Sequence, residues 1–218
     1  MTKSRIIETN SGIHGPDVEI FDRMAKGMRD KGWIETDAII KTGINSGVCL
    51  EIGPGPGYIG LEWLKRTEGT LLKGLDISSD MIEVAKRNTK EYGFENRVEY
   101  VISSADTIPF DDNTFDGVFS TGSLHEWAEP ENIFNEIFRV LKPNGKFFVG
   151  DLRRDMNPFV KFLMKLFVKP KEIKPGLESS INASYTVTEL EKIIENTTIT
   201  SFNIKKDVIG LSVTGQKL

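Results

Sequence analysis

Apolar residues alternate along the middle of the chain between short runs and amphipathic stretches. Short apolar runs between glycine, serine or charged residues predict strands, and apolar positions three or four residues apart predict helices. Five strands are predicted, at residues 48–52, 71–77, 97–102, 115–120 and 146–151. Helices are predicted at residues 58–66, 80–92 and 131–141, the last ended by the turn Pro143-Asn144-Gly145. Strands separated by helical segments imply a parallel sheet with right-handed crossovers.

The two flanks of this alternation have a different pattern. Residues 17–31 and 34–42 predict two N-terminal helices, and residues 153–184 predict a basic, partly helical insertion. A helix predicted at residues 188–196 begins with Thr188 and Glu191, which suit a capping box. Two last strands, near residues 199–206 and 211–216, can pair as an antiparallel hairpin.

The composition is that of an ordinary globular protein, with 39% hydrophobic and 28% charged residues in a chain of 218. A net charge of −4 gives no footprint for general nucleic-acid binding. No apolar run reaches the ~20 residues that cross a bilayer, and residues 1–16 lack the apolar segment of a secretory signal. The single cysteine, Cys49, predicts a packed side chain rather than a nucleophile. We therefore expect a cytoplasmic protein without stable membrane association.

The stretch CLEIGPGPGYIG, after the first predicted strand, is the strongest candidate for a site. Its glycines, Gly53, Gly55 and Gly57, would let a ligand approach the main chain. Asp76 ends the second predicted strand, at the spacing from Gly57 that a ribose-binding acid has in a dinucleotide fingerprint. Three interpretations stay open at this point: a nicotinamide dinucleotide, another adenosine cofactor, or a tight turn without a ligand.

The prolines and the acid of the same loop favour a cofactor without phosphate. Pro54 and Pro56 have no N–H group to donate to a pyrophosphate. The carboxylate of Glu51 would repel a pyrophosphate but attract an ammonium or sulfonium group. The loop therefore predicts an adenosine cofactor that carries positive charge.

Four segments in order then resemble the class I S-adenosylmethionine-dependent methyltransferases, especially the small-molecule branch of ubiquinone and menaquinone biosynthesis. EIGPGPG at residues 51–57 resembles the family's first motif, and Asp76 in GLDIS its second. Residues 104–116 resemble the third and fourth segments, and RVLKPNG at residues 139–145 the motif before the fifth strand. The resemblance covers about residues 46–151, with a weaker match at 185–196. It implies a Rossmann-like, seven-stranded, mostly parallel sheet with an antiparallel last strand.

The resemblance also implies roles for single residues and a division of the chain. Glu51 and the loop glycines would engage the methionine end of S-adenosyl-L-methionine, and Asp76 the ribose. The remaining implied cofactor contacts are Ile77, Met81, Ala105, Asp106, Ser120 and Thr121. The expected parts are a helical cap (1–43), a cofactor-binding core (44–152), a lid-like insertion (153–184), and a helix with a hairpin that completes the core (185–218).

Two features concern the methyl acceptor. His125 follows the fourth predicted strand and could serve as a general base near its ordinary pKa of ~6.5, whereas His14 suits a solvated loop. Residues 157–174 mix large apolar residues with lysines, which predicts first an amphipathic surface helix, second a lid, and third a membrane contact. No metal site is predicted.

The sequence thus predicts a methyltransferase with a small-molecule acceptor of unknown identity. The alternatives are a non-catalytic S-adenosylmethionine-binding protein and, less favoured, an NAD-dependent oxidoreductase. A homodimer stays open.

Overall fold

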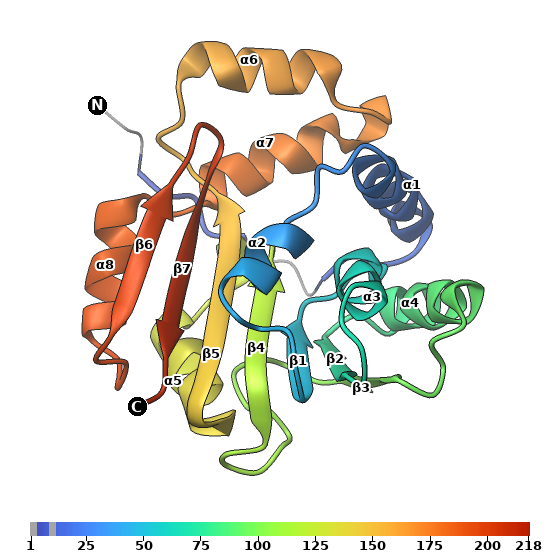
Figure 1. Cartoon of the computed structure of the whole chain (residues 1–218). Helices are drawn as coiled ribbons and strands as arrows, with labels where there is room; N and C mark the ends of the chain where they lie inside the picture. The colour runs from blue at the N-terminus through green and yellow to red at the C-terminus, as the bar shows by residue number, and fades with distance from the viewer. Residues whose placement is uncertain (1–3, 9–11) are drawn as a thin grey trace.

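The computed structural model describes residues 4–8 and 12–218 as a single seven-stranded sheet between helices (Figure 1). The strand order is β3-β2-β1-β4-β5-β7-β6. The first five strands are parallel to one another, and β7 runs antiparallel between β5 and β6. The predicted parallel sheet with an antiparallel last strand is confirmed.

The predicted elements all form, and most of their ends lie within three residues of the predicted ones. The strands are β1 Val48–Ile52, β2 Leu71–Asp76, β3 Val98–Ile102, β4 Phe115–Thr121, β5 Leu141–Leu152, β6 Phe202–Lys206 and β7 Gly210–Gln216. The α-helices are α1 Pro16–Asp30, α2 Thr36–Lys41, α3 Tyr58–Lys65, α4 Ser79–Tyr92, α5 Pro130–Val140, α6 Pro158–Phe167, α7 Lys174–Ala183 and α8 Val187–Glu195. Two 3-10 turns, η1 Leu124–Glu126 and η2 Lys171–Ile173, complete the order.

The start of β5 differs from the prediction. The strand begins at Leu141, directly after α5, because Leu141 pairs with Phe115 before the register shifts to the pair Gly117–Lys146. The intervening residues 142–145 bulge from the ladder. Asn144 N donates to the carbonyl oxygen of Lys217 over 2.7 Å, so the sequence taken for a helix-ending turn lies inside a strand.

The predicted capping box of α8 is wrong by two residues. Thr186, not Thr188, is the N-cap: its hydroxyl accepts from the backbone N–H of Glu189, whose carboxylate accepts from Thr186 N. Both threonines are followed three residues later by glutamate, so spacing alone could not choose between them. Tertiary contact selects the earlier pair, because Glu189 also binds the buried guanidinium of Arg154.

Two hydrophobic layers hold the sheet in place. On one face, α5 and α8 bury Phe134, Ile137 and Leu190 against β1, β4 and β5. On the other face, α2 and α3 bury Ile39 and Trp63 against β1, β2 and β4. Cys49 lies in this second layer with no exposed surface, and burial raises the pKa of its thiol to about 12, so the prediction of a packed cysteine is confirmed.

The flanking helices cover the end of the sheet at which the parallel strands terminate. In Figure 1, α1 lies beside α3 and α4, while α6 and α7 lie above the ends of β4 and β5. α7 contacts η1, and α6 has no buried residue. Within residues 4–8 and 12–218, no helix is both long and apolar enough to span a membrane.

Candidate functional site

The candidate site lies where the carboxyl ends of the central strands meet. The glycine loop follows β1, Asp76 ends β2, and η1 with His125 follows β4. β2 and β4 lie on either side of β1. A Cβ on Gly53 would lie 2.9 Å from the side chain of Ser123, so the loops after β1 and β4 touch. Ligands of open α/β sheets bind at this edge, where the strand order reverses.

The loop glycines have left-handed backbone conformations. The φ angles of Gly53, Gly55 and Gly57 are 66°, 52° and 85°. A side chain would be strained at each of them. Gly57 is also closely packed, since a Cβ there would lie 2.9 Å from the hydroxyl of Tyr100. The groups that exclude side chains at Gly53 and Gly57 therefore belong to the protein, and the loop is built by its own fold.

Every backbone donor between residues 53 and 57 already has a partner. Gly53 N donates to the carbonyl oxygen of Leu75 over 2.8 Å, and Gly57 N donates to that of Pro54 over 2.9 Å. Gly55 N donates to Oδ2 of Asp76 over 3.0 Å. The prolines have no N–H group. The loop thus offers no free donors to a pyrophosphate, which agrees with the preference read from the sequence.

Asp76 joins the glycine loop to the next helix. Its Oδ2 accepts from Gly55 N and its Oδ1 accepts from Ser78 N over 2.9 Å. Burial raises the pKa of Asp76, while these backbone donors lower it, and the net direction is upward. A carboxylate oxygen has a second lone pair, so each can still accept from a ribose hydroxyl. Ile77 beside it is 49% exposed, open to an adenine ring.

Glu51 lies beneath the first turn of α3. Its side chain is buried, and a Cβ on Gly60 would meet the Glu51 carboxylate at 2.2 Å. Burial raises the pKa of Glu51 to about 8, although Gly60 N–H lowers it; nearby Asp76 raises it further. Among the described residues, Glu51 Oε2 has no hydrogen-bond partner. A buried acceptor without a partner suits a donor brought by a ligand, such as an ammonium group.

The other cofactor contacts implied by the resemblance lie in different surroundings. Met81 is buried between α1 and α4 with Val18 and Val84, as a core residue would be. Asp106 is exposed and accepts from Ser104 Oγ over 2.6 Å, beside the half-buried Ala105. Buried Ser120 donates to the carbonyl oxygen of Ile52 over 2.8 Å, and Thr121 is half-buried. The structure therefore places Glu51, Asp76 and Ser120 around the glycine loop. Met81 lies in a neighbouring core cluster, and Asp106 lies at the exposed surface.

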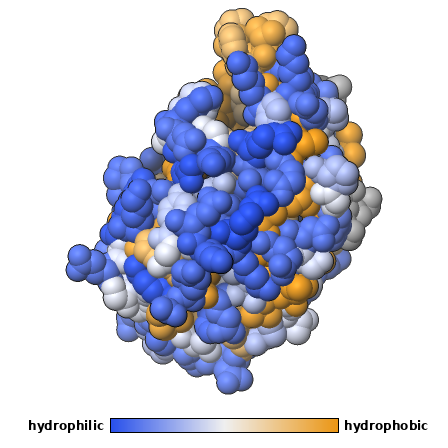
Figure 2. Space-filling model, turned by 90° about the vertical axis from the view of Figure 1, so that its right-hand side faces the viewer, coloured by the Kyte–Doolittle hydropathy of each residue, from blue (hydrophilic) through white to orange (hydrophobic). Residues whose placement is uncertain are grey.

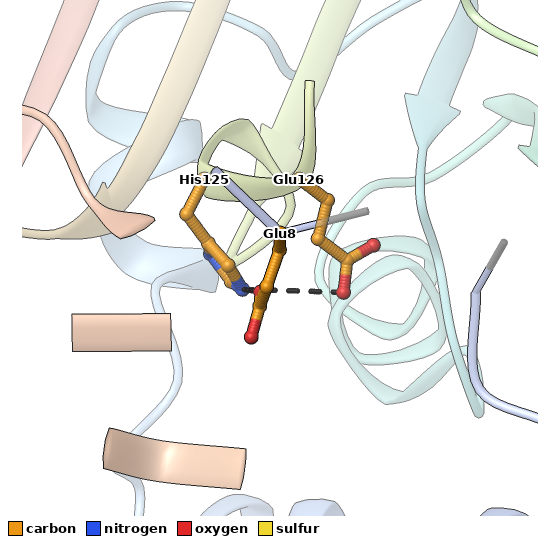
Figure 3. A group of neighbouring side chains, drawn as sticks. All are labelled: Glu8, His125 and Glu126. Atoms are coloured by element: carbon orange, nitrogen blue, oxygen red, sulfur yellow. Dashed lines mark ion pairs between the residues drawn. The ribbon is translucent and has the colours of Figure 1, made fainter. Parts of the chain in front are cut away.

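His125 is buried in a group of acids, shown in part in Figure 3. Its Nδ1 lies 2.9 Å from Asp151 Oδ2, and its Nε2 lies 3.4 Å from Glu8 Oε2. Burial lowers the pKa of His125, but Asp151, Glu126 and Glu8 together raise it to about 9. The expectation of an ordinary pKa near ~6.5 is wrong for this arrangement, because the sequence did not place three carboxylates around the ring. A protonated imidazole near neutral pH cannot act as a base.

The sequence analysis missed three residues of this group: Asp151, Glu8, and Glu126, which directly follows His125. Asp151 lies in β5 and also accepts from the backbone N–H of His125 over 2.7 Å. An acid near the carboxyl end of a parallel strand was the available signal, and it was not used. Glu8 lies far from His125 in sequence, and no pattern links the two. His14, 3.8 Å from Asp80, pairs with α4 rather than with this group.

Residues 50–149 match the family model of the methyltransferase domain. This stretch is a class I, S-adenosylmethionine-dependent methyltransferase domain. The match covers all five parallel strands except the first residues of β1 and the end of β5, together with the glycine loop and Asp76. The family expected from the sequence is confirmed for this part of the chain.

Relatives of the methyltransferase domain extend the likeness. The ubiquinone/menaquinone biosynthesis C-methyltransferase UbiE of Geobacter sp. (strain M21) is 25% identical over 76% of this chain and 71% of that protein. The chain spans 37%, 36% and 51% of the length of three further curated methyltransferases, to which it is 30%, 34% and 35% identical. The similarity to these three proteins is therefore limited to part of their length, and the rest of each protein does not align with this chain.

Solved structures match nearly the whole chain. A protein from Methanococcus maripaludis proposed to be an S-adenosyl-L-methionine-dependent methyltransferase has a TM-score of 0.76 at 24% identity, over 97% of both chains. A SAM-dependent methyltransferase from Aquifex aeolicus has a TM-score of 0.73 at 20% identity, over 95% of this chain and 100% of that one. At these identities the likeness shows the fold, including the flanking helices and the terminal strands.

Proposed function

We propose that this protein transfers the methyl group of S-adenosylmethionine to a small-molecule acceptor. The observation that carries the proposal is the glycine loop of the methyltransferase domain. Its donors are all used within the protein, Asp76 lies against it, and the partnerless oxygen of Glu51 is buried beside it. This combination suits a cationic adenosine cofactor without phosphate.

The residues of the chain then serve chiefly to bind and orient. Asp76 would hold the ribose hydroxyls. Glu51 keeps its proton near neutral pH in the free protein; an ammonium group of the cofactor beside it would favour its ionised form and pair with it. Ile77 would lie beside the adenine, with Ala105 and Asp106 at its edge, while Ser120 and Thr121 would line the methionine end. The sulfonium supplies the activated methyl group. Orientation of this kind can contribute ~7–11 kcal/mol to lowering a barrier.

We assign the acceptor side to residues 1–43 and 153–184, as far as the structure describes them; residues 1–3 and 9–11 lie outside the description. Phe21 of α1 lies 3.5 Å from the position of a Cβ on Gly55, and α7 contacts the η1 turn that carries His125. His125, protonated near neutral pH, would orient the acceptor rather than remove its proton. A net charge of −4 and one buried cysteine suit a cytoplasmic enzyme of small molecules.

Calorimetry with S-adenosylmethionine, its demethylated product and NAD tests the cofactor. We expect both adenosyl compounds to bind and to stabilise the fold by ~2.7 kcal/mol at 100 times the dissociation constant, and NAD not to bind. Tight binding of NAD with no binding of S-adenosylmethionine would overturn the proposal. Incubation with methyl-labelled cofactor and fractionated metabolites then separates an enzyme, which labels a product, from a protein that only binds the cofactor.

A further inference from the structure

We propose that Glu8, His125 and Glu126 form a binding site for one divalent transition-metal ion at the carboxyl end of β4. One ligand atom from each residue lies within 4.8 Å of the other two. Figure 3 shows the three side chains pointing toward one another, Glu8 from the N-terminal segment and the other two from η1. This site goes beyond methyl transfer and does not depend on it.

The spacing of the ligand atoms suits direct coordination. His125 Nε2 lies 3.4 Å from Glu8 Oε2 and 3.9 Å from Glu126 Oε1. Two ligands that each bind a tetrahedral ion at ~2.1 Å are about 3.4 Å apart. Small rotations of the two glutamate side chains would therefore bring all three atoms to bonding distance. One imidazole nitrogen with two carboxylates is a ligand set that Zn²⁺ and Mn²⁺ accept.

The histidine is oriented in the way that metal ligands usually are. Nδ1 of His125 lies 2.9 Å and 3.1 Å from the two oxygens of Asp151. Asp151 is itself fixed, because Oδ2 accepts from His125 N over 2.7 Å and Oδ1 from Leu152 N over 2.6 Å. Asp151 holds a proton on Nδ1, and an ion that binds at Nε2 would displace the second proton of the imidazolium there, on the side that faces the two glutamates. Carboxylate–histidine pairs support metal-binding histidines in the same manner.

The group carries more negative than positive charge, even with a protonated imidazole. Three carboxylates, those of Glu8, Glu126 and Asp151, surround a single imidazole. Arg5 is close but is used elsewhere, since it donates to the carbonyl oxygens of Ala183 over 2.5 Å and His125 over 2.9 Å. A divalent ion would balance the two glutamates, whose mutual repulsion otherwise opposes their approach.

The segment that carries Glu8 is anchored at the site. Ile6 N donates to the carbonyl oxygen of Asn182 over 3.1 Å, and the Arg5 guanidinium lies 4.1 Å from the centre of the Tyr185 ring. Arg5 and Ile6 thus anchor the segment just before Glu8 and hold Glu8 over η1. An ion bound here would tie the N-terminal segment to the end of β4, on the acceptor side of the sheet.

Metal binding by the full, untagged chain tests the proposal. After dialysis against a chelator, the protein is titrated with Zn²⁺ and, separately, with Mn²⁺, and bound metal is measured by calorimetry and elemental analysis. We expect one ion per chain for at least one of the two metals. Glu8→Gln and Glu126→Gln should each weaken binding tenfold or more, and Glu129→Gln, an exposed glutamate nearby, should leave it unchanged.

Two results would overturn the metal site: no binding of either ion, or binding that neither glutamine variant weakens. In the first case the group is an ion-pair network around a protonated histidine. Circular dichroism confirms that each variant is folded, and a titration with S-adenosylmethionine on the same samples keeps the two proposals separate. If the natural protein binds S-adenosylmethionine but neither metal ion, only the metal site is rejected; if it binds a metal ion but not S-adenosylmethionine, only the cofactor assignment is rejected.

Discussion

Helices α3 and α6 are of similar length but have opposite surroundings. Six of the eight residues of α3 are buried, and none of the ten residues of α6 is. Yet α6 is rich in large apolar side chains: Phe159, Phe162, Leu166 and Phe167 are all more than half exposed. Figure 2 shows this apolar surface at the top of the molecule, where α6 lies.

The difference separates the matched domain, to which we assign the cofactor, from the insertion, to which we assign the acceptor. The surroundings of α3 are fixed by sheet register and by the glycine loop, and they fall within the matched methyltransferase domain. α6 lies outside that match, and its exposed face leaves it free to change without cost to the core. Binding of a common cofactor needs a rigid, buried framework such as the one around α3. Recognition of a particular acceptor can use an exposed element such as α6.

The largest effect is expected for a buried aromatic residue of the cofactor half. Phe119 is fully buried in β4, with its ring 5.7 Å from that of Trp63 in α3. Phe119→Ala should lower the free energy of unfolding by ~3–5 kcal/mol, because the lost burial is joined by a cavity. Urea denaturation with an unchanged slope measures this loss. A loss below ~1 kcal/mol would mean that this layer does not hold the site as argued.

The next effect concerns cofactor affinity. Asp76→Ala should weaken binding of S-adenosylmethionine by at least ~1.5 kcal/mol, the lower range for a hydrogen bond to a charged group. It also removes the acceptor for Gly55 N and Ser78 N, so the variant must first be shown to fold. Asp111→Ala, at an exposed turn, is the matched control. An unchanged dissociation constant for a folded Asp76→Ala would remove Asp76 from the site.

The element order and the loop could be predicted because local chemistry determines them. Glycine and proline restrict the backbone directly, and strand–helix periodicity fixes the order of a parallel sheet. The loop needs φ of 66° at Gly53 and 85° at Gly57, and few residues other than glycine adopt such angles. The cysteine of β1 was placed correctly for the same reason, since its neighbours in sequence are apolar.

The acidic group around His125 could be predicted only in part, because it depends on contacts between distant segments. His125 and Asp151 are 26 positions apart and meet only through the pairing of β4 with β5. Glu8 reaches them through an N-terminal segment that has no periodic pattern. Without these partners, the ordinary pKa of histidine was the only available guide, and it misled. The capping box of α8 was predicted two residues too late for the same reason, because the contact of Glu189 with Arg154 cannot be seen in the sequence.

A smaller, pH-dependent effect is expected for Glu51. The ordinary pKa of this glutamic acid is 4.5, whereas in the fold its pKa is raised to about 8, chiefly by burial. The folded state therefore holds a proton that the unfolded state has lost, so stability from this group is full below pH ~4.5 and declines as pH rises toward 8. Glutamine does not titrate.

Glu51→Gln should consequently gain stability relative to the natural protein between pH 5 and pH 8, by at least ~1.4 kcal/mol, the equivalent of one pKa unit. Urea denaturation at several pH values measures the difference. Glu95→Gln, at an exposed position, should run parallel to the natural protein throughout. If the Glu51→Gln curve is also parallel, Glu51 is ionised in the fold, and its burial is compensated by a partner that the described contacts do not include.

The smallest effect on stability is expected for α6, where the comparison is sharpest. Phe162 is 60% exposed, so Phe162→Ala should change the free energy of unfolding by less than ~0.5 kcal/mol. Affinity for S-adenosylmethionine should also be unchanged, because α6 packs on α7 and lies outside the matched methyltransferase domain. We expect the exposed ring of Phe162 to contact an apolar acceptor instead of the protein core. Phe162→Ala should therefore raise the Michaelis constant for such an acceptor and leave the Michaelis constant for the cofactor unchanged. If both constants stay the same once the acceptor is known, α6 is an ordinary surface helix. If instead stability falls by more than ~1 kcal/mol, the exposed face is covered in solution, and the contrast with α3 does not hold.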